Sequence, residues 1–155
     1  MPDAAERRSV LLEGSTLVLV ADGSIARFLL RPRSDAYLAE TIENRMTAPP
    51  PRRERDRAPR VQDSFGGARH AIERRMTAHE SGEDKFIADV ADRTVALIRE
   101  HQPGCVALCA PPRALGQLRK LLAYPLSGLS MVSIDKDITK ESVGAIDARV
   151  RELHA

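Results

Sequence analysis

The chain has 155 residues, of which 43% are hydrophobic and 30% are charged, and its formal net charge is +2. This length is enough for one domain with a single hydrophobic core. With no Trp, three Phe and two Tyr, the chain is not expected to bind single strands by stacking bases on aromatic side chains. No run approaches the ~18 apolar residues of a membrane span, and residues 1–9 lack the apolar centre of a signal peptide. We therefore expect a cytoplasmic protein with no membrane partner.

An antiparallel meander is predicted at the start of the domain, after a polar tail at residues 1–13 that we expect to be flexible. Residues 16–21 form an apolar run rich in β-branched side chains, and residues 25–30 form a second, mostly apolar run. The Asp22-Gly23 pair between them predicts a hairpin, because Asp-Gly suits a tight two-residue turn. A third run at residues 36–43 is expected to add another antiparallel strand.

A long basic connection follows at residues 46–82. Nine arginines lie between Arg45 and Arg75 against four acidic residues, an excess of about +5. Compact domains rarely contain structureless connections of this length unless the loop is functional or disordered. We expect a mobile loop whose charge suits a phosphate-rich partner.

The second half of the chain alternates helix and strand. The expected elements are a helix at 83–101, a strand at 106–110, a helix at 113–123, a strand at 129–134 and a final helix with Thr139 as its N-cap. Helical crossovers make the later strands parallel to each other. The prediction is a single α/β domain at residues 14–155. Its mixed five-stranded sheet has a three-strand antiparallel meander plus two parallel crossover strands, with three helices.

The only two cysteines, Cys105 and Cys109, lie on one face of a predicted strand. Four residues of strand separate them by about 13 Å, whereas a disulfide needs Cα atoms within roughly 7 Å. We therefore expect two buried free thiols, which fits a reducing compartment.

Several polar residues are expected to meet at one edge of the sheet. If the crossover strands also run parallel to the first strand, their carboxyl ends share an edge, where open α/β sheets usually bind ligands. The candidate residues at this edge are Asp22, Arg113, Asp135, Lys136 and Asp137. The three aspartates, together with Glu40, could hold Mg²⁺ for a nuclease or phosphoesterase. The simpler interpretation is that Asp22 forms the turn and that the other two aspartates precede the N-terminus of a helix.

Other catalytic patterns are weak. The spacing of His70 and His79 matches no strong zinc motif, and Ser64 stands in no Gly-x-Ser-x-Gly sequence. Phosphate-binding and dinucleotide-binding glycine motifs are missing. We therefore predict no catalytic residue, metal or cofactor.

Four stretches carry a resemblance to a known family. They are residues 18–27 (VLVADGSIAR), 63–70 (DSFGGARH), 106–115 (VALCAPPRAL) and 134–139 (IDKDIT). With these the chain resembles the bacterial host-attachment protein family, whose name implies attachment of bacteria to a host. The order of meander, long loop and long helix is also similar, more distantly, to the middle domain of archaeal and eukaryotic peptide-chain release factors and of pelota. That second resemblance implies a ribonuclease-H-like sheet.

The loop of release factors carries Gly-Gly-Gln, and the corresponding stretch here is Gly66-Gly67-Ala68. Because the glutamine is absent, the resemblance implies a pelota-like action on ribosomes without hydrolysis. We therefore predict a non-catalytic factor that binds the ribosome or structured RNA in rescue, protection or stress. The predicted phosphate contacts are Arg52, Arg53, Arg55, Arg57 and Arg60, and the predicted inserted tip is Gly66, Gly67, Arg69 and His70. The alternatives are the metal-dependent nuclease above and an adaptor whose loop binds a protein partner.

Overall fold

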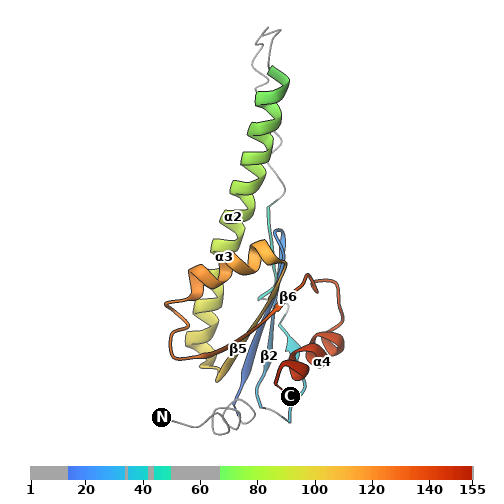
Figure 1. The fold of residues 1–155 in the computed structure, drawn as a ribbon. Coiled ribbons are helices and arrows are strands. Elements are labelled where there is room, and N and C mark those ends of the chain that lie inside the picture. The colour runs from blue at the N-terminus through green and yellow to red at the C-terminus, as the bar shows by residue number, and fades with distance from the viewer. Residues whose placement is uncertain (1–13, 34, 42–43, 50–66, 155) are drawn as a thin grey trace.

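A computed structural model describes residues 14–33, 35–41, 44–49 and 67–154, with backbone alone for 67–81 and 154. These residues form a six-stranded sheet and three helices (Figure 1). The strands are β1 (Thr16–Ala21), β2 (Ile25–Arg31), β3 (Ala39–Glu40), β4 (Met46–Thr47), β5 (Cys105–Ala110) and β6 (Ser130–Asp135). The helices are α2 (Gly67–His101), α3 (Pro112–Leu122) and α4 (Val143–His154).

The Asp-Gly turn joins β1 and β2 as predicted. Asp22 Oδ1 accepts hydrogen bonds from the backbone N–H groups of Ser24 and Ile25, both at 2.7 Å. The Asp22 N–H in turn donates to the carbonyl of Ile25 at 2.9 Å. A side-chain acceptor of this kind favours Asp at the start of a tight turn. The turn sets the antiparallel register in which Ala21 pairs with Ala26.

The mixed sheet is confirmed, with strand order β3-β2-β1-β5-β6 and β4 paired to β2. β5 is parallel to both β1 and β6, so the crossover strands do run parallel to the first strand. The carboxyl ends of β1, β5 and β6 therefore meet at one side of the sheet, which we call the carboxyl edge. This topology positions every candidate residue discussed below.

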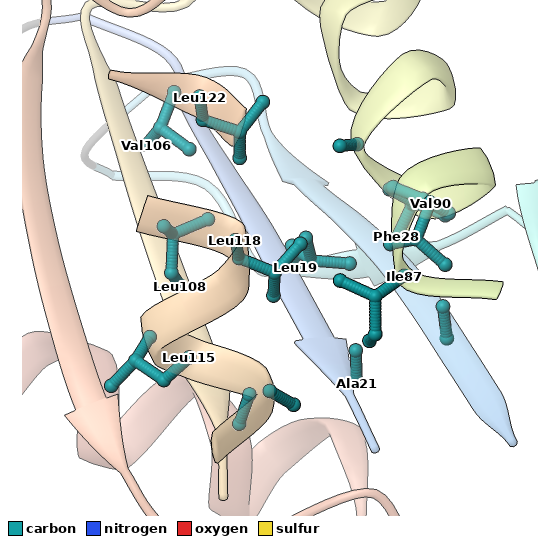
Figure 2. Packing of buried hydrophobic residues seen from close by; sticks show 14 of the residues in the cluster. Leu19, Ala21, Phe28, Ile87, Val90, Val106, Leu108, Leu115, Leu118 and Leu122 are labelled. Atoms are coloured by element: carbon teal, nitrogen blue, oxygen red, sulfur yellow. The ribbon is translucent and has the colours of Figure 1, made fainter. Parts of the chain in front are cut away.

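Helices α2 and α3 cover one face of the sheet. Figure 2 shows leucine and valine side chains of α2 and α3 packed against side chains of β1, β2 and β5. Leu19, Leu108 and Leu118 are each 0% exposed, and burying a side chain of this size stabilises the fold by roughly 1.5–3 kcal/mol. The helix predicted at residues 83–101 packs here, since its Ile87 and Val90 belong to this core.

Helix α4 covers the opposite face with a smaller core. Ile146 and Val150 pack over Val18 and Val20 of β1 and over Cys109 of β5. Both cysteines of the chain are buried and neither forms a disulfide, as predicted. Burial raises the pKa of the Cys105 thiol to about 11 and that of Cys109 to about 12, because an apolar surrounding disfavours the thiolate.

Helix α2 is longer than predicted, since it begins at Gly67 and not near residue 83. Residues 68–78 are rich in Ala, Arg, Glu and Met, which favour helix without any apolar stripe. A Cβ on Gly23 would lie 2.8 Å from Glu83 Oε1, so α2 passes the carboxyl edge at about Glu83. At 1.5 Å per residue, the part of α2 before Glu83 projects ~24 Å beyond this edge, as Figure 1 shows. None of the described helices is long and apolar enough to cross a membrane.

The strand expected at residues 36–43 is reduced to Ala39–Glu40. Leu38 turns instead into the core beneath α4 and is 5% exposed, which takes the chain off the ladder. The predicted loop at 46–82 contains β4 at its start and the beginning of α2 at its end. Its residues 50–66, like the predicted tail at 1–13, lie outside the described part of the chain.

The predicted N-cap of the final helix was also wrong. Thr139 does not cap α4: the Ser142 hydroxyl accepts the N–H of Ala145 at 3.2 Å, which is the bond of an N-cap residue.

Candidate functional site at the carboxyl edge

Two of the five predicted edge residues come together at the carboxyl edge. Asp22 and Asp137 approach the same hydroxyl, because Thr139 Oγ1 lies 3.4 Å from Asp22 Oδ2 and 2.6 Å from Asp137 Oδ1. Asp137 Oδ1 also accepts the Thr139 N–H at 3.0 Å. These hydrogen bonds from Thr139 hold the pKa of Asp137 below its usual range.

The other three predicted edge residues follow the ends of β6 and β5. Asp135 and Lys136 are exposed at the end of β6. Arg113, on α3, lies 3.9 Å from Asp84 of α2 and so belongs to the helices on the opposite face. The described residues contain no group of three His, Cys, Asp or Glu side chains that could hold a metal ion. Asp22 and Asp137 each accept hydrogen bonds from backbone N–H groups two or three residues further on, as turn residues do.

Glu40, the fourth expected magnesium ligand, is bound by a buried arginine. Arg27 Nε and Nη2 donate to the two carboxylate oxygens of Glu40 at 2.8 and 2.9 Å. Arg27 Nη1 donates to the backbone carbonyls of Thr139 and Glu141 at 2.9 and 2.7 Å. Its side chain is only 6% exposed. Arg27 thus joins β2 to β3 and to the segment between β6 and α4.

The arginine and the carboxylate shift each other's protonation. The hydrogen bonds from Arg27 lower the pKa of Glu40, and the bonds to Glu40 raise the pKa of Arg27. Both ions are therefore favoured, as expected for a two-pronged guanidinium–carboxylate pair. A second buried pair lies further along β2, where Arg31 Nη1 donates to Asp147 of α4 at 3.1 Å. Arginines on β2 thus attach both α4 and the segment before it to the sheet.

A hollow of about 410 Å³ opens beside Arg27, on the face of the sheet that α4 covers. Its walls come from β2, from β4 and the residue before it, and from the segment between β6 and α4. It is lined by Ile25, Arg27, Arg45, Thr47, Thr139, Lys140 and Glu141. We call it the edge hollow. No sequence motif pointed to it, although the arginines alternating with apolar residues in β2 were a signal that polar groups meet on this face.

The predicted RNA contacts lie mostly outside the described residues. Arg52, Arg53, Arg55, Arg57, Arg60 and Gly66 belong to the segment between β4 and α2. Gly67, Arg69 and His70 lie in the first turn of α2, where the structure describes the backbone alone. Their predicted roles stay predictions.

A comparison with known families decides what kind of protein this is. Residues 17–150 match the family described as "Protein required for attachment to host cells". The chain belongs to this family. The host-attachment match spans all six strands, the edge hollow and most of α4, and it confirms the nearer of the two predicted resemblances. No curated protein matches the chain, and the similarity to release factors and pelota stays a prediction.

Proposed function

We propose that this host-attachment family chain is a non-catalytic binding protein for structured RNA, with the ribosome as its candidate target in rescue, protection or stress. The proposal rests on the two points where the arginine-rich segment, residues 49–66, joins the fold. The Ala48 N–H donates to the carbonyl of Ser24 at 2.7 Å, so the chain stays on the hairpin turn up to Ala48. Further along the sequence, Gly67 begins the part of α2 that projects beyond the carboxyl edge.

The charge of this segment suits a nucleic acid. Between Ala48 and Gly67 the sequence has five arginines, against three acidic residues. Arginine binds phosphate through a planar fork of donors and remains charged at all physiological pH values. A basic segment attached at one end to the hairpin turn and at the other to the projecting helix can follow a phosphate backbone while the sheet sets its position.

The projecting half of α2 supports a target with a deep groove or cavity. It holds Gly67 ~24 Å beyond the sheet edge, at the far end of the longest helix (Figure 1). Gly66 and Gly67 have no side chains to prevent close approach of their backbone to a partner. A narrow helix with two glycines at its end can enter a space that the sheet itself cannot.

The proposal is tested by measuring the binding of purified protein to ribosomes and to a structured RNA hairpin over a range of salt concentrations. The test variant replaces Arg52, Arg53, Arg55, Arg57 and Arg60 with Ala. Removing each phosphate contact should reduce the slope of log K against log salt by about 0.9 for a duplex. Binding should weaken for all RNA sequences alike, because phosphate contacts carry no sequence information.

The control variant is Lys85→Gln/Arg99→Gln/Lys120→Gln, which removes exposed positive charge from α2 and α3. It should change the slope by less than about 0.9, the effect of a single phosphate contact. Equal binding and equal slopes in the wild type and the five-arginine variant would contradict the proposal. In lysates, sedimentation with ribosomal subunits that disappears at high salt or after ribonuclease supports the ribosome as target. Sedimentation at the top of the gradient under every condition rules that target out.

A protein-binding adaptor is the second candidate. The family description names attachment, and exposed apolar side chains lie on α3 and β6, where Arg119 of α3 donates to Ser133 of β6. Tyr124 is 89% exposed, Leu121 46% and Met131 40%. An adaptor of this kind should capture a protein that stays bound after nuclease treatment and is released on replacing Tyr124 with Ser.

A further inference from the structure

The edge hollow has positively charged groups on its rim that its own acidic residues do not neutralise. Its floor is Arg27, whose donors are used by Glu40 and by two backbone carbonyls. Its lining carboxylate, Glu141, accepts two hydrogen bonds from Arg149 of α4, both at 2.7 Å. Glu40 and Glu141 therefore each have a strong cationic partner already.

The other cations of the lining are Arg45 and Lys140. Arg45 Nε lies 3.5 Å from Glu40 Oε1, but its side chain is 49% exposed and Glu40 is held closer by Arg27. An ion pair with that exposure contributes little, roughly 0–1 kcal/mol, so it does not commit the guanidinium. Lys140 is exposed on the opposite wall, near the carboxylate of Asp137. The Thr47 hydroxyl adds a neutral donor to the lining.

This donor set fits a phosphate group. A guanidinium fork and an ammonium bind phosphate oxygens by charge-assisted hydrogen bonds. The volume of about 410 Å³ lies within the ~300–1,000 Å³ of small-ligand sites, which leaves room for the sugar next to the phosphate. The lining contains no aromatic side chain, so the hollow offers no surface on which a base could stack.

We propose that the edge hollow binds a phosphate group through Arg45, Lys140 and Thr47, and that this phosphate belongs to the RNA backbone. The assignment of this phosphate to the RNA backbone rests on the proposed function. The hollow lies next to Ala48, where the arginine-rich segment leaves the hairpin turn. A backbone bound by this segment therefore has the hollow beside the point where the segment begins. The hollow would fix the register of the RNA on the domain without reading its sequence.

The test variant is Arg45→Gln/Lys140→Gln, and the matched control is Arg99→Gln/Lys120→Gln, which removes the same charge from exposed positions on the other face. Lys140→Gln alone serves as a milder variant that leaves the Arg45–Glu40 contact in place. Thermal melts establish that all variants fold. We measure RNA-hairpin affinity against salt, and the amide NMR shifts of Thr47, Thr139 and Lys140 during titration with inorganic phosphate and with adenosine monophosphate.

The expected result is RNA affinity weakened roughly threefold to tenfold in the double variant, with a salt slope lower by about 1–2 and no such change in the control. If the wild type binds RNA and the double variant binds equally well, the inference is overturned while the proposed function stands. If the wild type binds no RNA, yet phosphate or the nucleotide shifts the hollow's amides in the wild type alone, the proposed function falls. The site then belongs to a small phosphorylated ligand. No RNA binding and no shifts overturn both.

Discussion

Replacing Arg27 with Met should destabilise the fold without touching any predicted RNA contact. Arg27 makes two hydrogen bonds to Glu40 and two to backbone carbonyls, and its side chain is 6% exposed. Met keeps much of the apolar stem in place but leaves these four acceptors without their donor. Removing one member of a buried ion pair costs about 3–5 kcal/mol.

Two features of the structure reduce the expected loss of unfolding free energy. Glu40 is 16% exposed and Arg45 lies 3.5 Å away, so the abandoned carboxylate can gain water and a second cation. We therefore expect Arg27→Met to lower the free energy of unfolding by about 2–4 kcal/mol. Urea unfolding followed by circular dichroism measures it. Arg33→Met is the matched control: its side chain is 76% exposed, and the expected change is within about 0.5 kcal/mol.

The pH dependence of the difference tests whether the carboxylate is responsible. The pKa of Glu40 is lowered from 4.5 in the fold, so its contribution to stability is present above the unfolded pKa and disappears as the pH falls through the folded pKa. The gap between wild type and Arg27→Met should therefore shrink below about pH 4.5. Arg27→Met/Glu40→Leu should recover much of the stability, since it leaves no unpaired charge. A destabilisation under about 1 kcal/mol for Arg27→Met, or a gap that stays constant down to about pH 3, would refute this account.

Two further measurements test other parts of the fold. Cys105 and Cys109 are each 0% exposed, with pKa values raised to about 11 and 12, so at about pH 8 a disulfide reagent should modify them only on unfolding. Fast modification of either thiol in native protein would contradict their burial. Ser142→Ala should cost about 1 kcal/mol of unfolding free energy by removing the α4 cap, whereas Ser142→Asp should retain it. Equal stability of the two variants would show that the hydroxyl does not cap the helix.

Local patterns in the sequence were enough for the four long strands of the sheet, β1, β2, β5 and β6. The Asp22-Gly23 pair predicts the hairpin because the turn uses only neighbouring atoms. The apolar run of β5 predicts a strand covered on both faces, because burial of every side chain leaves no polar alternation. Helical crossovers then determine that β5 and β6 run parallel. Each step depends on residues close to one another in the chain.

The candidate site depends on contacts that no local pattern contains. Arg27 binds carbonyls 112 and 114 residues away, and Arg31 reaches Asp147 across 116 residues. An arginine in an apolar strand signals that a partner exists but not which one. The start of α2 escaped prediction for a different reason. Apolar periodicity detects only the part of a helix that packs on a core, and the projecting part has none.

The two arginines that line the hollow, Arg27 and Arg45, have different roles, so the proposals can be tested one at a time. Arg27 is buried and uses four of its five N–H donors for Glu40 and two backbone carbonyls, so it chiefly holds the walls together. Arg45 is half-exposed, with one long contact, so its guanidinium is available to an incoming anion. Changes at Arg27 should therefore appear in unfolding curves and affect RNA affinity only by loosening the hollow. Changes at Arg45 should appear in the salt dependence of binding and leave unfolding nearly unchanged. The opposite result would be a loss of stability on changing Arg45 and a loss of salt-dependent binding alone on changing Arg27. The hollow would then be a structural gap, and the arginine-rich segment alone would have to hold the RNA.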